Sequence, residues 1–220
     1  MPQYLKKILT GAVLYIILVI FFVVLKPIWT SIALTLILGL ILLFEWPKLF
    51  NIKRPTFWLL MPFYPILPFL LMIYMSSIEQ YRILLYYMIL ISYSQDLGGY
   101  AFGKIIGKRK LAPAISPKKT WEGFWGGIII TFLVLHLLLF LCQSKMAFFP
   151  SVLFSLSISI LATVGDLFES LLKRRVGIKD SGWILPGHGG LLDRFDSLMF
   201  VAPLFFLLRY YLIKLFNIVG

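Results

Sequence analysis

The chain has 220 residues, of which 60% are hydrophobic and only 14% are charged. A soluble domain is about half apolar and about a quarter charged, so this composition excludes an ordinary soluble fold and a disordered chain. The single cysteine, Cys142, excludes a disulfide scaffold. The class that remains is a polytopic helical membrane protein, here with a net charge of +12.

Seven segments are long and apolar enough to be transmembrane helices of roughly 20 residues. In chain order they cover residues 8–25, 28–44, 57–75, 81–99, 121–142, 147–167 and 197–216. The first is expected to be an uncleaved anchor, since it has no small-residue cleavage pattern. The third contains Pro62, Pro65 and Pro68, each of which removes a backbone donor, so it is expected to be kinked or re-entrant. The predicted fold class is an all-α transmembrane bundle of about seven spans.

Lysine and arginine are distributed unevenly between the loops that alternate across such a bundle. Sixteen lie in one set of loops and five in the other. Because cytoplasmic loops are enriched in Lys and Arg, the set with sixteen is expected to be cytoplasmic. This orientation places the N-terminus and the long polar loops 100–120 and 168–196 inside the cell, and the C-terminus outside.

Seven of the nine acidic residues lie in or beside those two loops. They are Asp96, Glu122, Asp166, Glu169, Asp180, Asp193 and Asp196. The other two, Glu45 and Glu79, fall in short loops and are interpreted as unremarkable. Charges beside a membrane segment are costly and usually mark a site or a pathway, although ion pairs among loop residues are the alternative.

The spacing of these acids favours a site. One group, at the i, i+3, i+4 and i+7 positions of a helix leaving the membrane, is Asp166, Glu169, Ser170 and Lys173. A second group, at the i, i+3 and i+4 positions where the last span begins, is Asp193, Asp196 and Ser197. Two carboxylates on one helical face require a cation, and a cluster of oxygen ligands suits Mg²⁺.

The segment between the two groups, residues 179–190, is rich in glycine and proline. Glycine allows backbone N–H groups to approach a phosphate closely. Four basic residues surround it: Lys173, Arg174, Lys179 and Arg194. A flexible cytoplasmic loop would explain the basic residues, but it would not explain carboxylates interleaved among them at helical spacing.

The other polar loop ends at Thr120, where a helix is expected to begin. Thr120 can cap that helix with Glu122 in its first turn. Alternatively, Lys118 and Lys119 at the helix start hold a nucleotide triphosphate. The sequence favours neither interpretation over the other.

Residues 170–196 resemble the signature of the phosphatidate cytidylyltransferase family, also called CDP-diacylglycerol synthases. The signature runs S-x-apolar-K-R, four residues, K-D-x-small, two residues, apolar-P-x-H-G-G, two residues, D-R-x-D. The chain supplies Ser170, Leu172, Lys173, Arg174, Lys179, Asp180, Gly182, Leu185, Pro186, His188, Gly189, Gly190, Asp193, Arg194 and Asp196. Upstream, Asp96, Gly98 and Tyr100 and the segment 116–123 are also similar to that family, so the resemblance covers roughly residues 92–197.

The resemblance implies that CTP and phosphatidic acid react to give CDP-diacylglycerol and pyrophosphate, in phospholipid biosynthesis. It implies candidate catalytic residues Asp166, Asp193, Asp196, Lys173, Lys179, Arg194 and His188. It implies candidate substrate-binding residues Lys118, Lys119, Ser170, Arg174, Gly189, Gly190 and Tyr100. The implied cofactor is Mg²⁺, as one or two divalent ions or one divalent plus one monovalent ion, with candidate ligands Asp166, Asp193, Asp196, Glu169 and Asp96.

On this interpretation, residues 1–90 form N-terminal transmembrane helices and residues 91–220 form the catalytic region. The expected location is the bacterial inner membrane, with no nucleic-acid partner, and a homodimer is compatible with the family. A CTP-dependent lipid-alcohol kinase remains an alternative and would release CDP instead of pyrophosphate. A non-enzymatic transporter is a second alternative, but it would place ionisable groups in the middle of broken spans.

Overall fold

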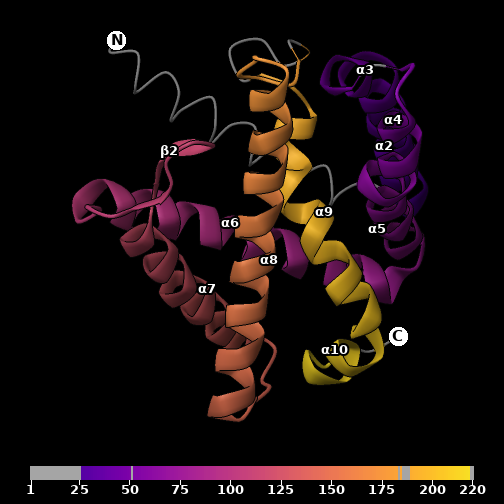
Figure 1. Cartoon of the computed structure of the whole chain (residues 1–220). Helices are drawn as coiled ribbons and strands as arrows, with labels where there is room; N and C mark the ends of the chain where they lie inside the picture. The colour runs from indigo at the N-terminus through magenta and orange to yellow at the C-terminus, as the bar shows by residue number, and fades with distance from the viewer. Residues whose placement is uncertain (1–25, 51, 183, 185–188, 219–220) are drawn as a thin grey trace, which may run out of the picture.

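The computed structural model describes residues 26–50, 52–182, 184 and 189–218, and these are mostly helical (Figure 1). The elements are α2 (Pro27–Leu40), η1 (Ile41–Glu45), α3 (Trp46–Leu49), α4 (Pro55–Leu60), η2 (Pro62–Ile66), α5 (Leu67–Ser77), α6 (Glu79–Ile105), β1 (Lys110–Ala112), β2 (Ser116–Thr120), α7 (Trp121–Leu141), α8 (Phe148–Arg175), α9 (Leu192–Leu207) and α10 (Arg209–Leu215). The elements η1 and η2 are single π-helical turns within longer helical segments.

Four helical segments in the described part of the chain are long and apolar enough to cross a membrane. They are Pro27–Leu49, Pro55–Ser77, Trp121–Leu141 and Phe148–Arg175. They coincide with the predicted spans 28–44, 57–75, 121–142 and 147–167. The second of them is broken at η2, where Tyr64 leaves the helical conformation among the prolines, so the predicted kink is confirmed.

The remaining predicted spans differ from expectation, and the total of seven is not confirmed. The last one consists of α9 and α10, which are bent by 81° and count as a span only if the bent pair is taken together. The fourth lies in α6, a continuous helix of 27 residues that is not among the candidate spans. Its second half is too polar, with Gln95 and Asp96 followed by paired glycines. The predicted span 8–25 lies outside the described residues.

The described residues are mostly helical, as the predicted all-α class requires, but the loop 100–120 contains one short exception. Helix α6 extends to Ile105, and the rest of the loop contains an antiparallel hairpin in which β1 pairs with β2. Lys110 faces Thr120 and Ala112 faces Ser116 across this hairpin. Pro113 and Pro117 explain the difference, because proline removes a helix donor and clashes with the preceding turn.

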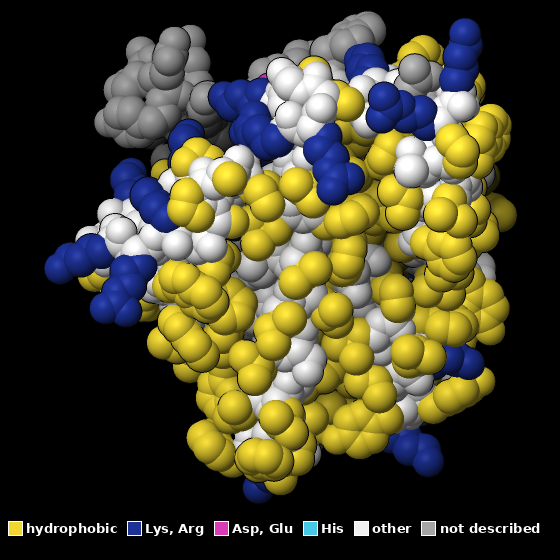
Figure 2. Space-filling view, viewed as in Figure 1, with side chains coloured by type: hydrophobic (Ala, Val, Ile, Leu, Met, Phe, Trp, Pro, Cys, Tyr) yellow, Lys and Arg dark blue, Asp and Glu magenta, His cyan; other side chains and the backbone are white. Residues whose placement is uncertain are grey.

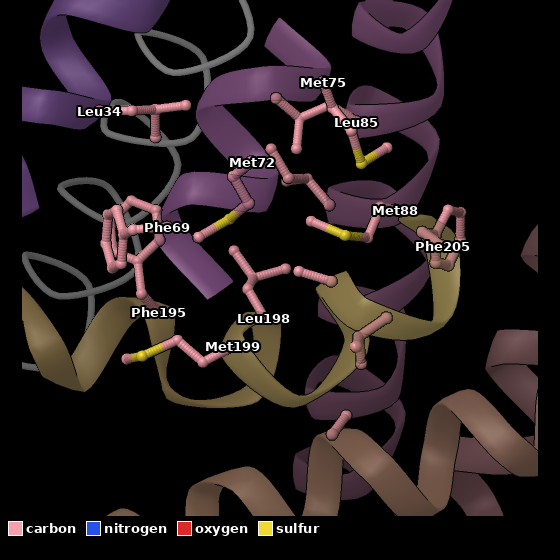
Figure 3. Packing of buried hydrophobic residues seen from close by; sticks show 14 of the residues in the cluster. Leu34, Phe69, Met72, Met75, Leu85, Met88, Phe195, Leu198, Met199 and Phe205 are labelled. Carbon is pink, nitrogen blue, oxygen red and sulfur yellow. The ribbon is translucent and has the colours of Figure 1, made fainter. Parts of the chain in front are cut away.

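The core lies where α5, α6 and α9 meet (Figure 3). Met72 and Met75 of α5, Leu85 and Met88 of α6, and Leu198 of α9 are all at most 2% exposed. Thioether side chains fill irregular gaps well, which suits helices that cross at different angles. This packing fixes the position of α9, the helix that carries the second predicted group of acids.

The surface divides into an apolar region and a basic end (Figure 2). Hydrophobic side chains cover most of the middle and lower part of the face in view, as expected for contact with lipid. Lysine and arginine gather mainly at the upper and left edges, near the hairpin and the C-terminal end of α8 in Figure 1. The polar loops that contain the candidate site residues therefore lie at the basic end of the molecule.

Candidate active site

The polar face predicted on α8 is present. Ser170 Oγ donates to Asp166 Oδ1 at 3.2 Å, one helical turn away. Lys173 Nζ donates to Glu169 Oε2 at 2.9 Å across the next turn. Side chains four residues apart meet on one side of an α-helix, so these contacts confirm the predicted spacing.

Lys173 joins this face to the start of α9. Its Nζ also donates to Asp193 Oδ1 at 2.6 Å. The other carboxylate oxygen of Asp193 accepts the backbone N–H groups of Gly190 at 2.8 Å and Ser181 at 3.1 Å. Asp193 lies in the first turn of α9, where the helix dipole favours a negative charge. Asp193, the first acid of the predicted second group, is therefore held in place by three hydrogen bonds.

Gly189 is placed where another residue would be strained. Its φ of +84° lies in the left-handed region, and an added Cβ would be 2.8 Å from Asp193 Oδ2. Glycine adopts this conformation without a steric penalty. The predicted importance of Gly189 thus has a structural basis next to Asp193.

A second cluster of acids forms between three helices. Asp96 of α6, Asp166 of α8 and Asp196 of α9 lie close enough to interact electrostatically with one another and with Lys119. The Lys119 ammonium forms an ion pair with the Asp166 carboxylate. Ser197 Oγ donates to Asp96 Oδ2 at 3.5 Å. Residues up to 101 positions apart in the sequence therefore meet beside β2.

A pocket of about 310 Å³ opens next to this second cluster. Residues of α6, the hairpin, α7 and α8 line it, and they include Asp96, Tyr100, Lys118, Lys119 and Asp166. Three of the predicted substrate-binding residues and two of the predicted metal ligands thus share one cavity. A cavity that combines acidic, basic and aromatic side chains can hold a metal-bound phosphate together with an aromatic base.

The start of α7 confirms the capping interpretation of Thr120. Thr120 Oγ1 accepts the backbone N–H of Gly123 at 3.1 Å. The Glu122 carboxylate accepts the backbone N–H groups of Lys108 at 3.1 Å and Arg109 at 3.2 Å, so it holds the hairpin to the helix. The lysines that precede this cap remain available to the pocket, and their binding of a nucleotide stays a prediction.

Three of the predicted basic residues are exposed, and one predicted residue is not described. Arg174 is exposed, and its guanidinium donates to the backbone carbonyls of Ile115 and Ile178. Lys179 and the side chain of Arg194 are also exposed. The predicted phosphate contact of His188 lies outside the described residues. The roles of these residues stay predictions.

The fit of the acids to a metal ion can be judged from their donor atoms. Within the described ranges, no three His, Cys, Asp or Glu side chains are arranged as a metal-binding group. The two clusters nevertheless offer oxygen donors of the kind that Mg²⁺ prefers. In the cluster around Lys173, Glu169 Oε1 is buried and has no hydrogen-bond partner among the described residues. The side chains therefore fit a hard cation by chemistry.

The interpretation of Glu45 as unremarkable is wrong. The residue is fully buried at the end of η1, and its carboxylate is hydrogen-bonded to the start of α9 and to Ser181. Sequence reasoning missed it because its partners lie more than 130 positions away. The available signal was a lone acid within the apolar run 41–46, since a charge in such a run usually has a function.

Comparison with known proteins gives a family match. The model of the cytidylyltransferase family matches residues 3–212. A phosphatidate cytidylyltransferase of Bacillus subtilis (strain 168) is 44% identical over 142 residues, which are 64% of this chain and 51% of that protein. One of Staphylococcus haemolyticus (strain JCSC1435) is 50% identical over 118 residues, which are 54% of this chain and 45% of that protein. The matches thus span about half the length of these curated relatives.

Proposed function

We propose that this chain, which belongs to the cytidylyltransferase family, transfers the cytidylyl group of CTP to phosphatidic acid. The products would be CDP-diacylglycerol and pyrophosphate. The names of the curated relatives support this choice of substrates. The structural observation that carries the proposal is that acids of α6 and α8 line one pocket with Lys118 and Lys119, and that Asp196 of α9 lies close to those acids.

In the proposed reaction a phosphatidate oxygen attacks the α-phosphorus of CTP and forms a new P–O bond. The bond from the α-phosphorus to the bridging oxygen of the β-phosphate breaks, and pyrophosphate leaves with its electron pair. Phosphoryl transfer depends mainly on positioning and on neutralising charge. Lys118 and Lys119 would neutralise and orient the phosphates, and no general base is required because phosphatidate is already ionised near neutral pH.

We propose Mg²⁺ as the cofactor. When bound, it would neutralise negative charge on the reacting phosphates. Asp96, Asp166 and Asp196 face one another beside the pocket and would be its main ligands. Glu169 and Asp193 also offer carboxylate oxygens, but they share Lys173 in the structure.

The proposed location is the bacterial inner membrane, with the basic end of the molecule in the cytoplasm. This orientation suits the substrates, since CTP is soluble and phosphatidic acid lies in the bilayer. The predominance of Lys and Arg at that end supports it. A homodimer is a further proposal, which the mass of the purified protein in detergent would test.

Product analysis tests the proposed function. Purified protein is incubated with phosphatidic acid and CTP labelled at the α-phosphorus, and the label is expected in a lipid product with equimolar pyrophosphate. In a parallel incubation with a lipid alcohol in place of phosphatidic acid, a lipid-alcohol kinase would leave that label in CDP. A transporter would consume no CTP in either incubation.

Asp166→Asn sharpens this test. We expect it to lower turnover by about 10²–10³-fold, because it removes a carboxylate that would hold Mg²⁺ at the reacting phosphates. Glu79→Gln is the matched control, since the side chain of Glu79 is 71% exposed and contacts only Arg82 among the described ion pairs. Wild-type turnover in the Asp166 variant would contradict the assignment of this carboxylate.

A further inference from the structure

Glu45 is a buried acid that none of the predicted roles includes. It ends η1, at the edge of the apolar segment Pro27–Leu49, and its side chain is fully buried. Within the described residues, no lysine or arginine forms an ion pair with it. A buried carboxylate without a cation is costly unless hydrogen bonds replace the lost water. The partners of Glu45 therefore indicate its role.

Those partners are at the beginning of α9. Glu45 Oε1 accepts the backbone N–H of Leu191 at 2.8 Å, and Oε2 accepts that of Leu192 at 2.8 Å. The first N–H groups of a helix have no partner within the helix, and α9 has no capping side chain of its own. Glu45 supplies this cap from a distant membrane segment, and the helix dipole stabilises its charge in return.

Ser181 connects this cap to the candidate active site. Its Oγ donates to Glu45 Oε2 at 3.1 Å, and its backbone N–H donates to Asp193 Oδ2 at 3.1 Å. Gly190 also lies close to both acids. Its N–H donates to Asp193, and a Cβ added to it would lie 2.8 Å from Glu45 Oε1. The two carboxylates therefore contact the same two short segments, at Ser181 and at Gly190.

Gly182 also belongs to this arrangement. A Cβ added to Gly182 would be 2.5 Å from Glu45 Oε1, and Cβ atoms in proteins essentially never approach another heavy atom that closely. Together, Gly182 and Gly190 leave the space that the Glu45 carboxylate fills. The glycine-rich segment from which the sequence predicts phosphate binding thus also leaves room for a carboxylate, because Gly182 and Gly190 have no side chains.

We propose that Glu45 is a positioning residue for cytidylyl transfer. By fixing the first turn of α9, it orients Asp193, the next residue after its two N–H donors, toward Lys173. This inference rests on the proposed function. It also makes the membrane segment Pro27–Leu49 part of the active-site framework, whereas the sequence-based division at residue 90 separates the two.

Glu45→Gln is the decisive variant, since it keeps the size of the side chain. One acceptor oxygen becomes an NH₂ group facing a backbone donor, so one N–H of α9 loses its bond. We expect kcat to fall about 10–100-fold, the usual effect of losing a residue that orients a direct ligand. The KM for phosphatidic acid should stay within about twofold, since Glu45 contacts no substrate in this scheme.

Two further variants grade the effect. Ser181→Ala removes one of the three hydrogen bonds to Glu45 and keeps the backbone N–H that reaches Asp193, so its loss of kcat should be smaller. Glu79→Gln should behave as wild type. Hydrogen exchange gives the structural readout: the amides of residues 189–195 should exchange faster in Glu45→Gln, whereas those of α7 should not.

The outcomes separate the two proposals. Wild-type kcat in Glu45→Gln overturns the positioning role, and so does faster exchange spread equally over all helices, which indicates a general loss of stability. If the wild-type protein forms no CDP-diacylglycerol, the proposed function fails. Faster exchange confined to residues 189–195 in the variant would then still support the coupling of Glu45 to α9.

Discussion

Lys173 connects two carboxylates on different helices, and Lys173→Met tests how much this connection stabilises the protein. Its Nζ donates to Glu169 Oε2 at 2.9 Å and to Asp193 Oδ1 at 2.6 Å. The side chains are 12%, 0% and 10% exposed for Lys173, Glu169 and Asp193, respectively. Methionine is flexible and of similar length, so the substitution removes mainly the charge.

The variant would leave two buried carboxylates without their cation. Removing one partner of a buried ion pair costs about 3–5 kcal/mol, because an uncompensated charge remains in a poorly solvated place. We therefore expect the free energy of unfolding to fall by about that amount. Water reaches these side chains poorly, so screening by solvent should reduce the effect only slightly.

Thermal unfolding of the purified protein in detergent measures the change. Glu169→Gln combined with Lys173→Met should recover part of the lost stability, because only one of the two carboxylates, that of Asp193, then remains without its cation. Lys48→Met is the control, since Lys48 is exposed at the end of α3. Unfolding of Lys173→Met at the wild-type temperature would refute the reasoning, as would a double variant no more stable than the single one.

Two more predictions concern the framework around the pocket. Thr120→Ala removes the cap on Gly123 N and should cost about 1 kcal/mol of stability, whereas Thr120→Ser should restore it, both measured by thermal unfolding. Gly98→Ala would place a Cβ 2.9 Å from the carbonyl oxygen of Gly126, so it should separate α6 from α7 and cost about 1–3 kcal/mol. Gly39→Ala is its control, since an added Cβ there would have no described residue within 4 Å. Equal stability of the two glycine variants would contradict the packing argument.

The parts of the site that depend on helical periodicity could be predicted from the sequence. The face from Asp166 to Lys173 and the acidic start of α9 follow from spacings of three and four residues, which are local properties of a helix. The clustering of Asp96 with Asp166 and Asp196 was anticipated only through the family resemblance. No local pattern shows which helices are neighbours.

The parts that depend on distant contacts or on competing local preferences could not be predicted. Glu45 is 146 residues from Leu191, so only the folded chain brings them together. The hairpin over residues 110–120 is short, and its lysines obscure any alternating pattern. The first half of helix α6 is apolar enough to suggest a span, but its second half is polar and buries only Ser94, Gln95 and Gly98.

The two lysines of the site are placed for different tasks, although both carry the same charge beside carboxylates. Lys119 is 25% exposed and lines the pocket, so an entering phosphate can replace Asp166 as its partner. An ammonium group on a flexible stem can change partners in this way. Lys173 is bound by two carboxylates. If its ammonium moved away from them, the buried carboxylates would lose their cation, at a cost of about 3–5 kcal/mol. We therefore propose Lys119 as the contact to substrate and Lys173 as the residue that holds the acids in place.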